Sequence, residues 1–432
     1  MAIDNDVVAA LKDRVLGPEH KSLPPAAWGK TVREFLAGAP HLDDLQTPVL
    51  TLDRSAMDSN LAVMADWARS AGVRLAPHGK TTMSPQLWGE QLTAGAWGIT
   101  LATGWQAQVG RSFGLNRIML ANALTDPIGL RWAAAESAAH PEFELFSWVD
   151  GVDTVKEMER HLESANVRLK VIVELGGPHG RTGARTVTEA LEVAEAVHNS
   201  SRLTLAGIGG YEGALAHDRS ADGLAAVRRY LTEIAWLHRS IAEAGWYGDR
   251  AIVTAGGSAY PDLVVDHLAG LADEEGAQGI PTTVVLRSGA YLIHDDGFYS
   301  GISPLAAGRT DHPLRSAMHG WARSVSRPET ELALLDAGKR DFPFDEGLPV
   351  PQRMAGPAVQ PIPEGATVTA LNDQHTFLRL PGGSAADVPV GSVVRLGLSH
   401  PCTAFDKWRL IPVIDDSDAE RPRIVDFLPT FF

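Results

Sequence analysis

The chain has 432 residues, of which 44% are hydrophobic, and a formal net charge of −15 at pH 7. This length is enough to bury a large core and predicts two domains, and the negative charge argues against partners such as nucleic acid or an anionic membrane. No apolar run reaches the roughly 18 residues that span a bilayer, the first residues lack a signal-peptide pattern, and a single cysteine rules out an internal disulfide, so we expect a cytoplasmic protein.

The first half of the chain alternates between predicted strands and helices. Residues 1–46 are expected to form a helical N-terminal extension, and residues 48–53 a strand that ends in a helix cap. The stretches that follow carry apolar residues at helical spacing, such as those from Leu224 to Ile234. Short apolar runs between them predict strands near residues 73–76, 97–101, 117–120, 143–149, 169–174, 203–208, 250–254 and 282–286. Eight strands alternating with helices predict a TIM-type (β/α)8 barrel over residues 47–286.

The last third of the chain has a different pattern. After about residue 287 the helical periodicity fades, and segments punctuated by proline and glycine, such as 366–371 and 392–396, are typical of antiparallel strands. We therefore expect a second, all-β domain over residues 287–432.

This second domain contains the only cysteine, Cys402, two residues after His400 and separated from it by Pro401. A thiolate and an imidazole at this spacing can converge on one metal ion, and a thiolate favours Zn²⁺ over Mn²⁺ or Mg²⁺. Two protein ligands would leave positions open for water or substrate. A lone cysteine is more often a small buried apolar residue, and this alternative stays open on the motif alone.

A second motif places Lys80 directly after the predicted strand at 73–76. Chemistry in barrel enzymes sits at the carboxyl ends of the strands. A lysine in a partly buried pocket has a lowered ammonium pKa, which makes its amine available for a Schiff base with an aldehyde such as pyridoxal 5′-phosphate. The alternative for a single lysine is a solvated surface position.

Taken together, the Pro-His-Gly-Lys-Thr motif at 77–81 and the His400/Cys402 pair resemble one branch of the fold-type III pyridoxal-phosphate enzymes, the D-serine dehydratases and D-threonine aldolases. The resemblance covers residues 46–412. It implies an alanine racemase-like barrel followed by a β domain, pyridoxal phosphate on Lys80, and Zn²⁺ on His400 and Cys402. It also implies a homodimer in which the β domain of one subunit meets the barrel mouth of the other.

Several further residues are candidates for cofactor binding. Gly256, Gly257 and Ser258 follow the seventh strand, and we expect their backbone N–H groups and the serine hydroxyl to form a phosphate cup, although an ordinary turn is the alternative. The resemblance implies that Tyr211, after the sixth strand, touches the cofactor. It also implies that Arg181, after the fifth strand, approaches the pyridine ring, either at its nitrogen or at its phenolate oxygen.

The resemblance also carries over to positions near the first and last barrel strands. His78 and Tyr291 are expected to bind the cofactor. Arg287 matches the arginine of an Arg-Pro-Gly segment, but Ser288 replaces the proline, and a structural ion pair is the alternative role for Arg287. His375 resembles a histidine near the metal site, with a purely structural role as its alternative.

The implied reaction combines an electron sink with a Lewis acid. A D-amino acid with a β-hydroxyl group, such as D-serine, would lose its α-proton to Lys80 and its hydroxyl with the help of the metal, giving a 2-keto acid and ammonia. The same residues would serve the retro-aldol cleavage of a D-threonine aldolase, which gives glycine and an aldehyde. The sequence also leaves room for an amino-acid racemase, a noncatalytic pyridoxal-phosphate carrier or a cofactor-free binding protein.

Overall fold

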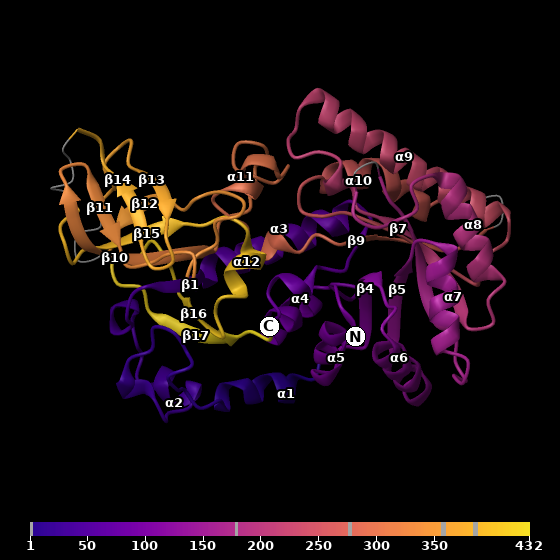
Figure 1. Ribbon diagram of the computed structural model, residues 1–432, viewed down its shortest axis with the longest axis horizontal. Coiled ribbons are helices and arrows are strands. Elements are labelled where there is room, and N and C mark those ends of the chain that lie inside the picture. Colours follow the sequence, from indigo (N-terminus) through magenta and orange to yellow (C-terminus); the bar gives the residue numbers. More distant parts are fainter. Residues whose placement is uncertain (1–2, 178–179, 275–278, 356–359, 383–387) are drawn as a thin grey trace.

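A computed structural model describes residues 3–177, 180–274, 279–355, 360–382 and 388–432 (Figure 1). This part of the chain forms two lobes. One is built on a sheet of eight parallel strands, and the other on a nine-stranded sheet that is mostly antiparallel.

The eight parallel strands form the predicted barrel. They pair in the order β2-β9-β8-β7-β6-β5-β4-β3, and the first and last of them also meet. Trp97 N donates to Leu75 O at 2.6 Å, Thr100 N donates to Pro77 O at 2.8 Å, and His78 forms a parallel bridge with Thr100. The expected (β/α)8 fold class is therefore confirmed, with strands β2 (Arg74–Leu75), β3 (Ile99–Leu101), β4 (Arg117–Ala123), β5 (Glu144–Val149), β6 (Leu169–Leu175), β7 (Leu203–Gly210), β8 (Ala251–Ala255) and β9 (Thr282–Leu286).

Helices cover the outside of the barrel (Figure 1). On α9, Val227, Leu231 and Ile234 are buried, in agreement with the helical spacing of the sequence. The strands turn other side chains inward, where Met119, Phe146 and their neighbours form a separate apolar cluster. The helices of this lobe are α3 (Arg54–Ser70), α4 (Pro85–Thr93), α5 (Gly104–Ser112), α6 (Pro127–Ala139), α7 (Val152–His161), α8 (Val187–His198), α9 (Ala221–Glu243) and α10 (Pro261–Leu268).

The second lobe is the expected β domain. Its sheet has the order β13-β14-β11-β10-β1-β16-β17, and β12 and β15 attach beside β10. Two short helices, α11 (Phe298–Ile302) and α12 (Pro401–Phe405), lie on the side that faces the barrel (Figure 1). The strands are β1 (Val49–Asp53), β10 (Met318–Glu329), β11 (Leu332–Leu335), β12 (Val350–Met354), β13 (Thr367–Leu371), β14 (Thr376–Arg379), β15 (Val393–Gly397), β16 (Leu410–Ile414) and β17 (Ile424–Pro429).

Strand β1 lies in this second sheet, although it precedes the barrel in the chain. It pairs antiparallel with β10 and parallel with β16. The predicted limits of 47–286 for the barrel and 287–432 for the β domain followed chain order and so placed this strand with the barrel. A local strand pattern does not indicate which distant strand will be its partner. The second sheet is therefore assembled from both ends of the chain.

The N-terminal segment is made of short helices and also joins the two lobes. Asp4 N donates to Phe113 O of the barrel at 2.9 Å, and Leu42 N donates to Pro422 O beside the second sheet at 2.9 Å. No helix in the described ranges is both long and apolar enough to span a membrane. The helices of this segment are α1 (Asn5–Ala9), η1 (Ala10–Asp13), η2 (Pro25–Ala27), α2 (Val32–Ala37) and η3 (Leu42–Asp44).

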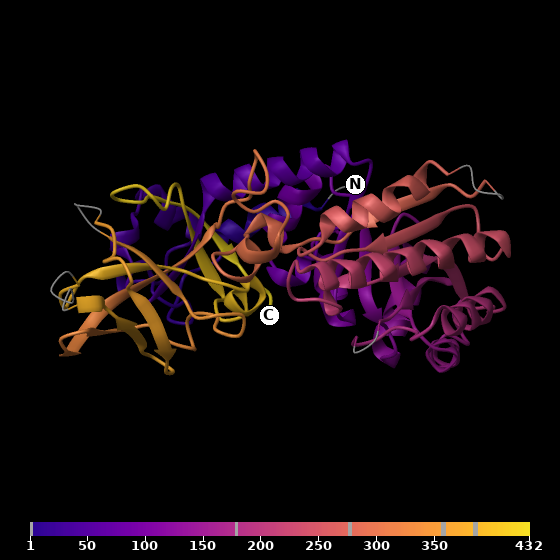
Figure 2. The same ribbon diagram turned by 90° about the horizontal axis from the view of Figure 1, so that it is seen from above.

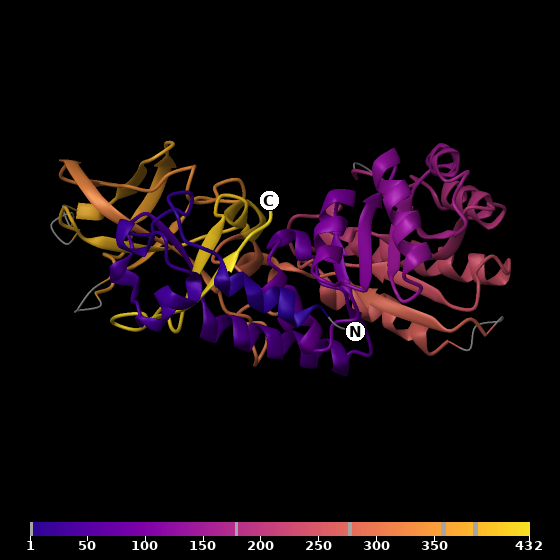
Figure 3. The same ribbon diagram turned by 90° about the horizontal axis from the view of Figure 1, so that it is seen from below.

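Helix α3 follows β1 and runs along one side of the molecule from one lobe to the other (Figures 2 and 3). Its residue Asn60 is fully buried. The Asn60 amide donates to Leu292 O at 3.1 Å and to Arg315 O at 2.7 Å, and its oxygen accepts from Arg315 N at 2.7 Å. Residues 292 and 315 flank the segment that leads from the barrel into the second sheet, so one side chain holds this connection against α3.

We expect Asn60→Ala to lower the free energy of unfolding by about 3 kcal/mol, because it leaves three backbone groups without their buried partner. Asn199→Ala, on the exposed end of α8, is the matched control and should change it by less than about 0.5 kcal/mol. Chemical denaturation of both variants measures the difference. If the Asn60→Ala variant were as stable as the Asn199→Ala variant, water would replace the hydrogen bonds of Asn60 without a cost in free energy.

Candidate active site

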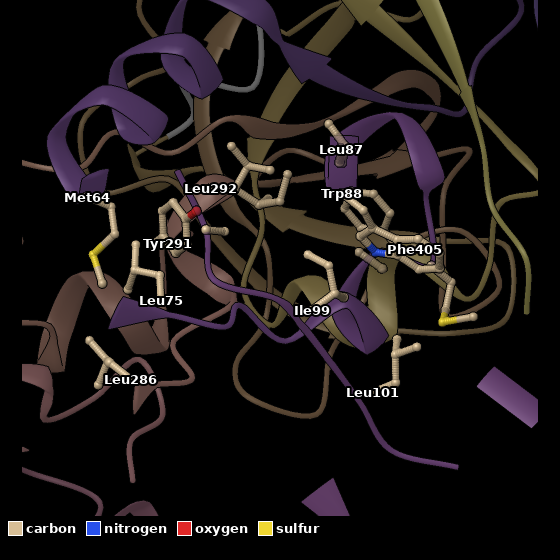
Figure 4. Packing of buried hydrophobic residues seen from close by; sticks show 14 of the residues in the cluster. Met64, Leu75, Leu87, Trp88, Ile99, Leu101, Leu286, Tyr291, Leu292 and Phe405 are labelled. Atoms are coloured by element: carbon tan, nitrogen blue, oxygen red, sulfur yellow. The ribbon is translucent and has the colours of Figure 1, made fainter. Parts of the chain in front are cut away.

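Lys80 lies on the 3₁₀ turn η4 (Gly79–Thr81), directly after β2 at the carboxyl end of the barrel. The turn rests closely on buried side chains: a Cβ atom at Gly79 would lie 2.6 Å from both Trp88 Nε1 and Ile99 Cγ2. Trp88 Nε1 also donates a hydrogen bond to Gly79 O at 3.1 Å. Trp88, Ile99 and Phe405 of α12 belong to one buried cluster (Figure 4). The turn that carries Lys80 therefore packs on a buried apolar cluster to which both lobes contribute residues.

The Lys80 turn meets the cysteine motif. Cys402 Sγ lies 3.5 Å from Thr81 Oγ1, the residue next to Lys80. Burial lowers the pKa of Lys80, the positive charges of Arg181 and Arg287 lower it further, and Cys402 opposes them. Two segments separated by more than 300 residues therefore form one site, which contains an amine with a reduced proton affinity.

His400 and Cys402 lie at the start of α12. His400 has a left-handed backbone with φ 58°, and its N–H donates to Asp295 Oδ2 at 3.2 Å. A hydrogen bond with Cys402, together with the hydrogen bond and charge of Asp345, raises the pKa of His400 to about 9 against the effect of burial. Burial acts to raise the pKa of the Cys402 thiol, but the hydrogen bonds with His400 and Thr81 and the charges of His400 and Lys80 together lower that pKa. Each of the two side chains therefore favours the charged form of the other.

This donor set fits a divalent metal with open coordination positions. His400 Nδ1 lies 2.5 Å from Asp345 Oδ2, which leaves Nε2 as the ring nitrogen available for a metal. Thr403 Oγ1 donates to the other oxygen of Asp345 at 2.7 Å and holds the carboxylate in place. No group of three or more His, Cys, Asp or Glu side chains converges as metal ligands in the described part of the chain. The protein would thus supply two ligands, and water or substrate the others.

We expect Asp345→Asn to weaken zinc binding about tenfold, because the carboxylate that orients His400 and increases its basicity is lost. Competition with a chromogenic chelator measures the affinity. Asp373→Asn, on an exposed turn of the β domain, serves as the control. An unchanged affinity in Asp345→Asn would mean that the backbone alone orients His400.

The phosphate cup differs from the one expected. The N–H groups of Gly256 and Gly257 donate to the two carboxylate oxygens of Glu212 at 2.8 and 2.9 Å, so they are not free for a phosphate. The expectation for these two glycines is therefore corrected. Ser258 remains at the cup, where its Oγ accepts from Ala290 N at 3.1 Å.

Four other backbone N–H groups on neighbouring loops are without an acceptor in the described part of the chain. The backbone N–H groups of Ser258, Ala259, Ser288 and Gly289 have no hydrogen-bond acceptor among the described residues. They lie on the two loops that follow β8 and β9, which are neighbouring strands. Such clustered N–H groups at strand ends form a concave site for an anion.

The remaining predicted cofactor residues surround the same barrel mouth. The Arg181 guanidinium lies 4.9 Å from the centre of the Tyr211 ring. His78 is half-buried, its Nδ1 atom is buried with no partner among the described residues, and a Cβ at Gly289 would lie only 2.6 Å from the His78 Cβ. Tyr291 is buried, and its hydroxyl accepts from a glutamine of α4 at 3.1 Å. Free N–H groups, an unpartnered buried imidazole nitrogen and a close backbone cradle fit a phosphate-bearing aromatic cofactor.

Arg287 has a structural position, but it makes no ion pair in the described part of the chain. It is buried, donates to Thr254 Oγ1 at 2.7 Å and to Gly210 O at 2.5 Å, and lies 5.2 Å from the centre of the Trp148 ring. Its Nε has no hydrogen-bond partner among the residues that the structure describes. His375 is exposed in the turn between β13 and β14, where it lines a surface hollow with Lys339 and its own neighbours.

Sequence reasoning missed three acidic residues at this site. Glu212 follows Tyr211 directly, so the strand-end pattern that selected the tyrosine also contained the glutamate. Asp345 lies in an exposed loop 55 residues before His400 and has no local motif. Asp295 accepts N–H groups from Gly297, Tyr299 and Ser300 at the start of α11, as well as that of His400.

Comparison with known proteins agrees with this fold and site. Residues 317–414 match the family described as "Putative serine dehydratase domain". A D-threonine aldolase from Arthrobacter sp. is 27% identical over 378 residues, which covers 87% of this chain and 91% of the relative. The crystal structure of D-threonine aldolase from Filomicrobium marinum superposes with a TM-score of 0.74 at 24% identity, covering 90% of this chain and 95% of that one.

A dehydratase is also similar to the chain. D-threo-3-hydroxyaspartate dehydratase from Delftia sp. strain HT23 is 24% identical over 365 residues, which covers 83% of this chain and 91% of the relative. The structure of a variant of a D-threo-3-hydroxyaspartate dehydratase in a metal-free form superposes with a TM-score of 0.72 at 19% identity, covering 91% of this chain and 99% of that one.

The fold, the barrel lysine and these likenesses define the class: the chain has the alanine racemase-like fold of the fold-type III pyridoxal-phosphate enzymes, and its relatives are lyases. Within that class it is a relative of the D-serine dehydratase and D-threonine aldolase branch, as the two motifs predicted.

Proposed function

We propose that the protein is a lyase that uses pyridoxal phosphate on Lys80 and a divalent metal on His400 and Cys402 to eliminate the β-hydroxyl group of a D-amino acid. The observation that carries this proposal is the 3.5 Å approach of Cys402 Sγ to Thr81 Oγ1, beside Lys80. A metal on His400 and Cys402 would lie beside Thr81, the residue that follows the attachment point of the cofactor in the chain. The two groups would then act on neighbouring carbons of one small substrate.

Pyridoxal phosphate, when bound, supplies an electron sink for the α-carbon. The four free N–H groups after β8 and β9 would hold its phosphate, and the half-buried His78 and the buried Tyr291 would border it. Lys80 Nζ would first hold the cofactor and then, once released by the substrate, take the proton from the α-carbon. Its lowered pKa favours the neutral amine that this step needs.

A divalent metal, when bound, supplies Lewis-acid assistance to the departure of the β-hydroxyl group. We propose Zn²⁺, because thiolate and imidazole are donors that it prefers. Asp345 would orient His400, and Asp295 would fix the backbone of His400 through its N–H. The products would be a 2-keto acid and ammonia.

Retro-aldol cleavage is the second candidate, and the 27% identity to a D-threonine aldolase favours it. The two reactions separate by product. We expect the protein, reconstituted with pyridoxal phosphate and zinc, to release keto acid and ammonia from D-serine and from D-threonine. Glycine with an aldehyde, and no keto acid, would reject the dehydratase and support the aldolase. A change of optical rotation that needs no metal would support a racemase.

We further propose a homodimer and a cytoplasmic location. The dimer follows from the family resemblance, and the location from the single cysteine, which suits a reducing compartment. Sedimentation of the full-length chain at micromolar concentration would test the dimer.

A further inference from the structure

The loop between β8 and α10 is held in an unusual way. Gly256 has a left-handed backbone with φ +106°, and a Cβ there would lie 2.3 Å from Leu286 Cδ1. A Cβ at Gly257 would lie 2.8 Å from the Tyr211 ring. The left-handed backbone favours glycine at position 256, and a side chain at either position would displace the Leu286 or the Tyr211 side chain.

Side chains from two other loops bind the backbone N–H and C=O groups of this glycine pair. Glu212, from the loop after β7, accepts both N–H groups, one on each carboxylate oxygen. Ser288, from the loop after β9, donates its hydroxyl to Gly257 O at 2.6 Å. The path of the chain into Ser258 is therefore set from two sides.

Glu212 itself is fully buried, which is costly for a carboxylate without compensation. Burial raises its pKa, whereas the two glycine N–H groups and the positive charge of Arg287 favour the anion. Arg287 donates hydrogen bonds to Gly210 O on β7 and to Thr254 Oγ1 on β8. These strands lead into the loops that carry Glu212 and the glycine pair. The folded chain therefore holds the two N–H donors and the Arg287 charge beside the Glu212 carboxylate. Hydrogen bonds from N–H groups to a carboxylate are stronger than those between neutral groups.

The next two N–H groups along the loop, those of Ser258 and Ala259, are two of the four that have no acceptor among the described residues. We propose that Glu212 is a positioning residue for cofactor retention: by taking up the N–H groups of Gly256 and Gly257, it presents those of Ser258 and Ala259 to the phosphate. This inference rests on the proposed function, since it requires that pyridoxal phosphate binds at the barrel mouth. It assigns Glu212 no contact with substrate or cofactor.

The test compares two probes that differ only in the phosphate. Apparent dissociation constants for pyridoxal 5′-phosphate and for pyridoxal are measured by absorbance on the full-length chain after removal of cofactor. In Glu212→Gln, the amide nitrogen would face a backbone N–H in place of an acceptor oxygen. We expect this variant to bind pyridoxal 5′-phosphate about tenfold or more weakly, while its affinity for pyridoxal stays within about twofold of the wild type.

Asp341→Asn is the matched control. Asp341 is also buried and also accepts a glycine N–H, from Gly338 at 3.1 Å, but it lies in the β domain. It should leave both affinities unchanged. Glu212→Asp keeps the charge but is too short to reach both N–H groups, so we expect a smaller loss that is again confined to the phosphate-bearing probe.

Several outcomes would overturn the role of Glu212. Equal weakening of both probes, no weakening, or tighter binding of pyridoxal 5′-phosphate would each reject it, the last by showing that the carboxylate competes with the phosphate. Loss of folding in both Glu212 variants but not in Asp341→Asn would also reject it in favour of a folding role. A wild-type chain that attaches no cofactor at Lys80 would instead reject the proposed function itself.

Discussion

Lys80→Ala is expected to abolish covalent attachment of pyridoxal phosphate and to lower activity on β-hydroxy D-amino acids by about a thousandfold or more. The variant removes both the amine that holds the cofactor and the base that takes the α-proton, and a positioned base alone contributes typically about 10²- to 10⁴-fold. Borohydride reduction followed by mass spectrometry of the labelled peptide measures attachment directly, independently of turnover.

Lys156→Ala provides the control, because Lys156 lies on the outer face of α7 with a side chain that is 69% exposed. It should keep both the label and the activity. Alanine at position 80 should also leave the fold intact, since Gly79 and Trp88 support the turn without the lysine. Labelling of another lysine in the wild type would place the cofactor elsewhere and remove the basis of the assignment.

Cys402→Ala and His400→Ala are each expected to lose zinc and most of the lyase activity. Each removes one of two protein ligands, so the loss of affinity should exceed the roughly 10- to 100-fold that outer-shell changes cause. Lewis-acid assistance is worth several kcal/mol, which corresponds to about a hundredfold or more in rate. Metal content by mass spectrometry and activity with and without added zinc measure the two effects.

The control for this pair is His140→Ala, since His140 lies at the exposed end of α6. Its zinc content and turnover should equal those of the wild type. Attachment of pyridoxal phosphate to Lys80 should survive in Cys402→Ala, which separates the two halves of the site. A Cys402→Ala protein that retains full metal-stimulated turnover would falsify the metal assignment.

The fold was predictable because its signals are local. Each barrel strand is a short apolar run, the strands before β9 are each followed by a helix, and all eight runs correspond to observed strands. The partner of β1 was not predictable in this way, because the pairing of Val49–Asp53 with β10 and β16 depends on segments more than 250 residues away.

The residues of the candidate site also fall into those with a local sequence signal and those that depend on distant contacts. Lys80, His400 and Cys402 stand in short motifs whose spacing indicates their chemistry, and the structure brings their segments together. Glu212 and Asp345 act through contacts with residues 44 and 55 positions away, and no pattern in the sequence indicates such contacts. The use of Gly256 and Gly257 was misjudged for the same reason, since a glycine loop does not reveal which acceptor its N–H groups will find.

The place of β1 in the second sheet also affects how the molecule is made. A strand between β10 and β16 has hydrogen-bonding neighbours on both edges, so a fragment that begins after the barrel would expose two open strand edges and tend to aggregate. During synthesis, β1 leaves the ribosome before β10 and β16, so its two partners in the sheet are not yet available. The two lobes are therefore poor candidates for separate expression, and the chain should reach its final form only after its C-terminal strands have been released.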